Sequence, residues 1–194
     1  MRIEDYKVPE SSFLSVNKDL SIIVDYMLKN KSLKKLLYYT SKDALKRPPL
    51  TEEQSLSLVN THIKLVPKIY IDEKVLTYII ISMDNFLPSN NPEFRNNIIT
   101  FDIICHFDQW QLLDFDLRPY RIAAEIDTII NNKKLTGIGR TEFLGCNQII
   151  LSDEFAGLTL MYMVYHGEED KKFAPNPINE ENLIENFNEL FNKK

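Results

Sequence analysis

The sequence predicts an α+β fold: a mostly antiparallel sheet of about four or five strands, with one central amphipathic helix packed on one face, two N-terminal helices and a C-terminal helix. Three observations predict it. Two runs rich in β-branched and aromatic residues, Val75–Met83 and Ile98–Phe107, flank a polar loop, which is typical of an antiparallel hairpin. An apolar stripe of helical period follows Arg118-Pro119. Two further strand-like runs, Glu142–Leu151 and Gly157–Tyr165, complete the pattern.

Length and charge are consistent with one domain that carries terminal additions. We expect an N-terminal arm and helices over residues 1–62, an α+β core over residues 63–172, and a linker with an amphipathic helix over residues 173–194. The net charge of -5 argues against a nucleic-acid-binding protein. Residues 1–50 nevertheless hold ten Lys/Arg against six Asp/Glu. This basic part could be a docking surface, although solvated helix faces are the simpler interpretation.

The first helix is predicted to begin at a cap formed by Asn17 or Asp19 and to end near Lys29. A second, shorter helix follows, because apolar residues recur at helical spacing over Leu33–Tyr38. Paired prolines after Arg47 then break any helix.

The core begins with an extended segment at Lys64–Lys68, where Pro67 favours an edge position because proline cannot donate to a strand ladder. The hairpin follows, and we expect Phe86–Glu93 to be its polar loop. In Ile98–Phe107, alternate residues form an apolar face and a mixed face, as in a sheet covered by helices on one side. The central helix should run from Arg118-Pro119 to Asn131.

Two cysteines, Cys105 and Cys146, lie in apolar strand-like runs. They are too few for a disulfide scaffold or a zinc site, and we expect both to be buried free thiols. No signal peptide is visible, and no run approaches the roughly 18 apolar residues that a membrane span requires, so we expect no membrane partner.

Three histidines suggest a metal or acid–base site. If the ends of the two strand pairs meet, His106, Asp108 and His166 could converge. No tight ligand motif supports this, so we favour structural roles for the histidines. The sequence also lacks a complete nucleotide-binding or nucleophile motif. We therefore assign no catalytic residue, no metal ligand and no cofactor.

The candidates for a subunit or partner interface share an apolar, aromatic or cationic side chain in a loop or in the last helix. They are Trp110, Phe86, Leu87, Phe94, Arg95, Phe187, Leu190 and Phe191. Trp110 is either an interface anchor or a ring packed over the end of the sheet. The last helix, with its apolar stripe, docks either on its own sheet or on another subunit.

Four features between Ile63 and Tyr165 follow one another in order. These are an extended lead-in with Val66-Pro67-Lys68, a hairpin of long strands, one helix after Arg118-Pro119-Tyr120, and a closing strand pair. This order resembles the tail terminator proteins of long-tailed bacteriophages and, more loosely, other small head–tail joining (neck) proteins. The N-terminal helices and the tail over residues 173–194 are longer than a minimal terminator needs, which leaves room for another neck ring protein, such as a connector or adaptor.

The resemblance implies a non-enzymatic virion protein without a cofactor, assembled in the host cytoplasm. Its copies would form a homo-oligomeric ring, commonly a hexamer, that terminates the tail tube and contacts the tail tube and head-connector proteins. DNA would pass through the lumen without specific binding, repelled by acidic residues. Two alternatives remain: a small ligand-binding or enzymatic α/β domain with a pocket near His106 and His166, and a host-side interaction module.

Overall fold

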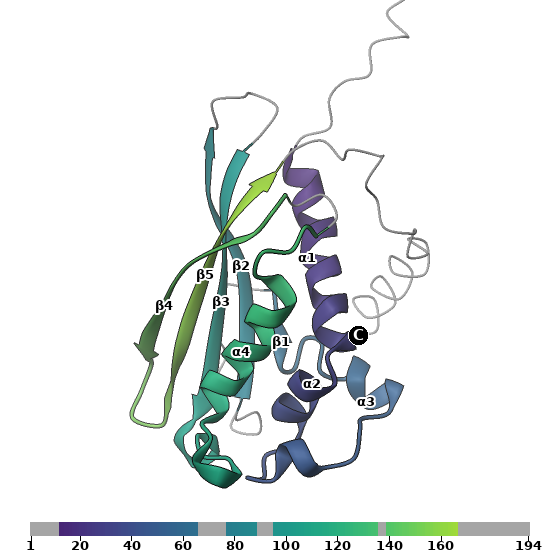
Figure 1. Ribbon diagram of the computed structural model, residues 1–194, viewed down its shortest axis with the longest axis vertical. Coiled ribbons are helices and arrows are strands. Elements are labelled where there is room, and N and C mark those ends of the chain that lie inside the picture. The colour runs from purple at the N-terminus through teal and green to yellow at the C-terminus, as the bar shows by residue number, and fades with distance from the viewer. Residues whose placement is uncertain (1–11, 66–76, 89–94, 136–138, 167–194) are drawn as a thin grey trace, which may run out of the picture.

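The computed structural model describes residues 12–65, 77–88, 95–135 and 139–166. It has two layers, with helices covering one face of a five-stranded sheet (Figure 1). The predicted α+β class is confirmed. The helices are α1 (Ser12–Lys29), α2 (Lys31–Tyr38), α3 (Glu52–Leu56) and α4 (Arg118–Ile130), and the strands are β1 (Ile63–Lys64), β2 (Thr77–Pro88), β3 (Arg95–His106), β4 (Glu142–Ile150) and β5 (Phe155–His166).

The two predicted N-terminal helices are present, and Asn30 separates them. Its side-chain oxygen accepts a hydrogen bond from the Leu33 backbone N–H at 2.9 Å, which caps α2. Its amide nitrogen donates to Glu125 of α4 at 2.9 Å, so the same residue joins the junction to the central helix. The predicted start of the first helix is wrong. The helix begins at Ser12, and Asp19 lies buried inside it rather than at its cap, because the helical pattern extends before Asn17.

The sheet has the strand order β1-β2-β3-β5-β4 and is antiparallel except for the pairing of β1 with β2. The hairpin of β2 and β3 is longer than predicted, because pairing continues to Pro88 opposite Arg95. A register irregularity lies between Asp84 and Leu87, and Pro88 is the last residue of the strand, where no further ladder donor is needed.

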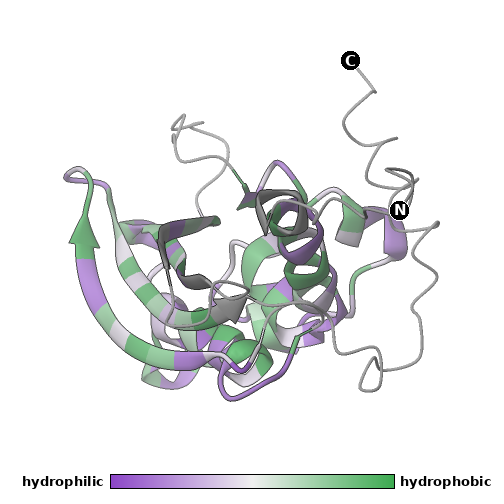
Figure 2. Ribbon diagram, turned by 90° about the horizontal axis from the view of Figure 1, so that it is seen from above, coloured by the Kyte–Doolittle hydropathy of each residue, from purple (hydrophilic) through white to green (hydrophobic). Residues whose placement is uncertain are grey.

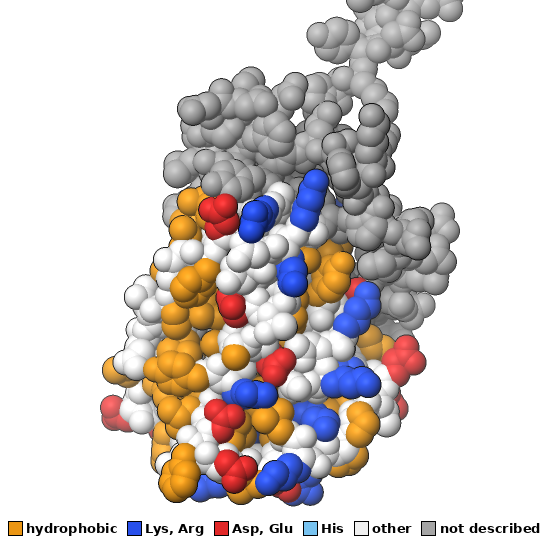
Figure 3. Space-filling view, in the orientation of Figure 1, with side chains coloured by type: hydrophobic (Ala, Val, Ile, Leu, Met, Phe, Trp, Pro, Cys, Tyr) orange, Lys and Arg blue, Asp and Glu red, His pale blue; other side chains and the backbone are white. Residues whose placement is uncertain are grey.

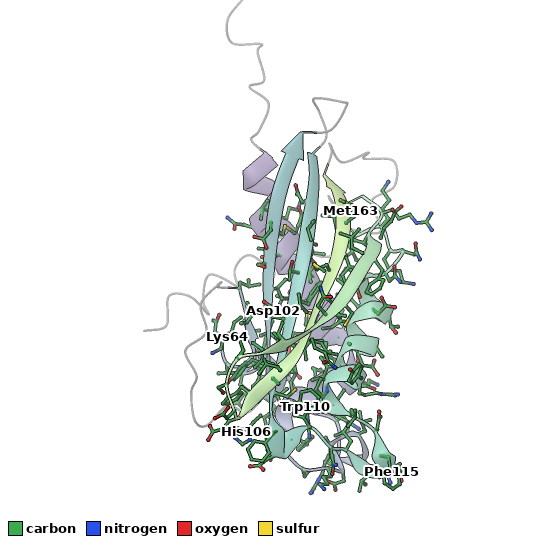
Figure 4. All side chains as sticks on the ribbon, turned by 90° about the vertical axis from the view of Figure 1, so that its left-hand side faces the viewer. Lys64, Asp102, His106, Trp110, Phe115 and Met163 are labelled. Atoms are coloured by element: carbon green, nitrogen blue, oxygen red, sulfur yellow. The ribbon has the colours of Figure 1, made fainter. Side chains whose placement is uncertain are left out.

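The main core lies between the sheet and the helices. β3 contributes Ile99, Phe101, Ile103 and Cys105 to it, which confirms the predicted apolar face. α4 buries Ile122, Ile126 and Ile130 against the sheet, as its stripe predicts. The other sheet face carries a smaller buried cluster of Tyr78, Ile80, Ile104 and Phe155. Polar Asp102 lies on this second face, where its carboxylate accepts a hydrogen bond from Thr159 at 2.6 Å (Figure 4).

The predicted closing pair of strands is confirmed as β4 and β5, and β5 also pairs with β3 along its length. β4 is therefore an edge strand. Seen from above, this hairpin is strongly curved (Figure 2). The predicted C-terminal helix lies outside the described residues.

Candidate interaction surface

The end of the molecule at which β3 runs into α4 is organised by one buried arginine. Arg118 is fully buried, and its five hydrogen bonds all go to backbone carbonyls. Nε donates to Gln109 at 2.8 Å, and the two terminal nitrogens donate to the carbonyls of Leu36, Tyr39, Thr40 and Ser41. Those four acceptors lie in or just beyond the last turn of α2, where helix carbonyls otherwise lack donors. Arg118 thereby joins the helical layer to the sheet end.

The charge of Arg118 is compensated by carbonyl dipoles, because every acceptor the structure gives it is a backbone oxygen. Burial lowers the pKa of its guanidinium, and the neighbouring Cys105 opposes that shift. A guanidinium stays protonated in proteins, so the side chain remains a cation at the carbonyl end of α2, where the helix dipole favours positive charge.

A short loop in front of Arg118 projects Phe115 into solvent. Gln111 and Leu117 form a bridge at its base, and the Leu113 N–H donates to the Lys42 carbonyl at 3.0 Å. Asp114 and Phe115 both have a φ of 61°. Two successive left-handed residues that are not glycine cost about 1–2 kcal/mol each. Phe115 is 102% exposed, so among the described residues nothing buries the large apolar ring that this strained loop presents.

Other exposed apolar side chains lie in the segment from the end of β3 to the first turn of α4. We define the end cluster as Phe107, Leu113, Phe115, Leu117 and Tyr120, all of which are exposed. Figure 4 places Phe115, Trp110 and His106 toward the same end of the molecule. The loop also borders a shallow hollow lined by apolar and charged residues, among them Lys42, Lys46 and Asp116.

A second group of exposed apolar side chains lies on β4 and on Leu151, the residue that follows it. We define the β4 edge group as Phe143, Leu144, Ile150 and Leu151, of which Ile150 is 82% exposed. Gln148 of β4 donates a hydrogen bond to the Tyr120 hydroxyl at 3.2 Å, so β4 contacts the end cluster at Tyr120. Figure 3 shows hydrophobic side chains along the margin over β4, whereas Lys and Arg gather over the helical side. We call the two groups together the apolar band.

The structure places some of the interface candidates predicted from the sequence. Trp110 is partly buried against the core, and its ring N–H donates to the Cys105 carbonyl at 3.2 Å, as expected for a ring packed at the sheet end. The prediction of a loop at Phe86, Leu87 and Arg95 is wrong, because the backbone of these residues is in β2 and β3. Phe94 and the last three candidates, Phe187, Leu190 and Phe191, lie outside the described residues.

The three histidines do not converge. His106 pairs with Phe155 at one end of β3, whereas His166 pairs with Arg95 at the other end. His106 lies 3.5 Å from Asp108 and stacks on Phe107, at a ring distance of 4.7 Å. His62 has a structural role: its Nδ1 lies 2.8 Å from the Thr77 carbonyl, and burial lowers its pKa. Among the described residues, no three His, Cys, Asp or Glu side chains group as metal ligands.

The two free cysteines differ from each other, and the prediction that both are buried is wrong for Cys146. Cys105 is buried in the core, where burial raises its thiol pKa to about 12. Cys146 is exposed, because it lies on the edge strand, which has no neighbour on its outer side among the described residues. In the same part of the chain, no helix is long and apolar enough to span a membrane.

None of the residues of the apolar band was among the candidates predicted from the sequence. Trp110, which was a candidate, lies near the band but outside it. A signal was present in Leu113-Asp114-Phe115-Asp116-Leu117, where apolar and acidic residues alternate outside any long strand. The left-handed backbone that turns Phe115 outward has no sequence signal, because neither Asp114 nor Phe115 is a glycine.

The fold and this surface define a small α+β protein with a large exposed apolar band, a feature typical of proteins that work in contact with other proteins. The YomW family model matches residues 30–164, more than half of the chain. The chain therefore belongs to the YomW family, which is phage-derived.

Other comparisons add little to the family assignment. No curated protein matches the chain. Among solved structures, a chain from the virion of a native gene transfer agent particle is 13% identical, with a TM-score of 0.42, over 58% of this chain and 83% of that one.

Proposed function

We propose that this protein is a non-enzymatic structural subunit of a phage virion, which forms a ring at the neck that terminates the tail tube and joins it to the head. The observation that carries the proposal is the apolar band. Nine of the ten exposed large apolar side chains in the described residues belong to it, and Leu56 is the exception. The chain belongs to a phage-derived family, which supports the proposal that other virion proteins cover the band.

Energetics favour a protein partner for the end cluster. Fully burying a phenylalanine side chain stabilises a complex by about 1.5–3 kcal/mol, and Phe115 makes none of that contribution within its own chain. The backbone at Asp114 and Phe115 already directs this side chain outward, so the backbone need not rearrange for a partner to reach it. An aromatic side chain of this kind is a typical hot spot.

A ring needs two different surfaces that are complementary, because each subunit contacts its neighbours head to tail. In this proposal the apolar band supplies one surface, and the helical layer with its lysines supplies the other (Figure 3). The final segment over residues 173–194, with Phe187, Leu190 and Phe191, would add contacts to the tail tube or head connector. Acidic residues facing the lumen would let DNA pass without binding it.

The test is genetic: if the proposal holds, the gene belongs to a phage genome, and that phage is the material. Deleting the gene should give DNA-filled heads separated from tails in negative-stain micrographs, with a large loss of infectious titre. Overlong tails would identify a terminator, and free tails of normal length would identify another neck adaptor. Intact infectious particles after deletion would refute the proposal.

A point variant tests whether the apolar band is an assembly surface. Phe115→Asp should fail to restore joined particles, because it places a charge where a partner buries an apolar ring. Leu56→Asp is the matched control: Leu56 is also exposed, at 39%, but lies on α3, outside the apolar band. Both variants should fold, as judged by circular dichroism. Equal complementation by the two variants would show that the end cluster is not the assembly surface.

A further inference from the structure

The outer edge of β4 is open and long. β4 is the last strand in the sheet order, and no strand among the described residues pairs with its outer side over nine residues. At the opposite edge the last strand, β1, has two residues, one of them Lys64, and pairs only with Ile79 and Ile80 of β2. Natural sheets usually protect an exposed edge with short strands, lysines or prolines, because unpaired backbone groups can recruit another strand.

β4 lacks most of these protective features. Its one charged residue is the first, Glu142, and the strand has no proline. Apolar side chains are exposed at both ends of the strand. The pairing of β4 with β5 has one irregularity, a register shift between Phe143 and Gly145. An exposed edge strand with apolar side chains and little charge is expected to pair with another strand.

The order of side chains along β4 indicates which strand this is. Phe143-Leu144 is apolar, Gly145–Gln148 is small or polar, and Ile149–Leu151 is apolar again. This pattern is almost unchanged when the strand is reversed. A two-fold axis through the middle of β4 would therefore place the apolar start of one strand beside the apolar end of an identical strand. Residues 143–151 are uncharged, so within this stretch no like charges face each other across the axis.

We infer that two copies of the free chain pair through the outer edges of their β4 strands, antiparallel and about a two-fold axis near Asn147, so that two five-stranded sheets become one. The inference does not depend on the neck role. In the pair, each β4 edge is covered and cannot add a foreign strand.

Variants at the axis test the pairing. The full chain, of 22.7 kDa, should sediment at twice that mass, with a dissociation constant measured over a concentration series. Asn147→Lys places two cations across the axis and should weaken the pair about tenfold or more. Asn147 is exposed, so the fold should be unchanged. Thr128→Lys adds the same charge at an exposed position of α4 and should leave the dissociation constant unchanged.

Cross-linking locates the contact. Near such an axis the two Cys146 thiols would lie within about 5–8 Å, the spacing of direct and diagonal neighbours across antiparallel strands. A short bismaleimide should link two chains and stop there, and Cys146→Ser should abolish the product, because Cys105 is buried.

Three results would overturn the inference: a wild-type monomer at every concentration, a dimer that Asn147→Lys leaves intact, or a dimer whose Cys146 thiols do not cross-link. The first would leave a strand from another protein as the partner. If the chain does not pair in solution but the gene deletion gives the expected phenotype, this inference fails and the proposed function stands. If the chain pairs but the deletion has no effect, the reverse holds.

Discussion

Replacing Arg118 by methionine should be among the most destabilising single changes in this protein. The variant has a side chain of similar length and no donor, so five backbone carbonyls lose their hydrogen bonds at once. The bonds to Gln109 and Leu36 are buried, and those to Tyr39, Thr40 and Ser41 are partly buried. A buried group left without its partner costs about 1–3 kcal/mol, whereas a partly buried carbonyl regains water.

Two buried carbonyls therefore set the expected loss at about 4 kcal/mol. Domains of this kind unfold with a free energy of about 5–15 kcal/mol, so the variant should remain folded but with much of its margin lost. Arg118→Lys should cost about half as much, since an ammonium has three donors and no planar fork. Arg121→Met is the matched control on the same helix. Arg121 is exposed and pairs with Glu125 at 3.7 Å, and such a pair contributes less than about 1 kcal/mol.

Urea unfolding measures these differences, with the free energy extrapolated linearly to water. Trp110 is the only tryptophan, and its carbonyl accepts the Arg118 backbone N–H at 2.7 Å, so its fluorescence reports on this junction. If Arg118→Met and Arg121→Met lower the free energy of unfolding by the same amount, then the five bonds do not stabilise the fold as argued.

Four further predictions compare two glycine variants, the reactivity of the two thiols, and the pH dependence of stability. Gly157→Ala should cost several kcal/mol, because its new Cβ would lie 1.7 Å from the Ile103 carbonyl oxygen, whereas Gly145→Ala, whose nearest contact is 3.8 Å from a methionine methyl, should change the urea midpoint little. Ellman's reagent should modify one thiol in the native chain, Cys146, and two after unfolding; two rapid equivalents in the native chain would contradict the burial of Cys105. Because the pKa of Cys105 is raised from 9.0 to about 12, the unfolded thiol ionises first, so the free energy of unfolding should fall as pH rises from 9 to 12, and less so in Cys105→Ala. The pKa of His62 is lowered from 6.5, so its contribution is present above that pH and lost as pH falls below it; His62→Gln should flatten the slope of stability against pH just below 6.5, and an unchanged slope would refute the assignment.

Periodicity was enough to predict most elements of the fold. The stripes at Leu33–Tyr38 and after Arg118-Pro119 became buried helix faces, and the two strand pairs formed as hairpins, because each pattern must bury one face. Boundaries were less predictable. Pro88 suggested a loop, but tertiary pairing with Arg95 continued the strand to that residue.

The apolar band could not be predicted, because exposure depends on which strand ends the sheet. Cys146 and Ile150 are in a strand-like run whose sequence does not distinguish a buried strand from an edge strand. They are exposed because β4 is the last strand in the sheet order. Arg118 was placed at the start of a helix, where an exposed side chain is the ordinary expectation. Its burial depends on carbonyls about 80 residues earlier in the chain.

That separation has a consequence for synthesis. The carbonyls at the end of α2 emerge from the ribosome long before Arg118 does, so the junction cannot close until both layers have been made and docked. The loop that turns Phe115 outward is attached to the same junction through Lys42. A partner that recognises Phe115 in this position therefore engages finished chains and passes over nascent or misfolded ones.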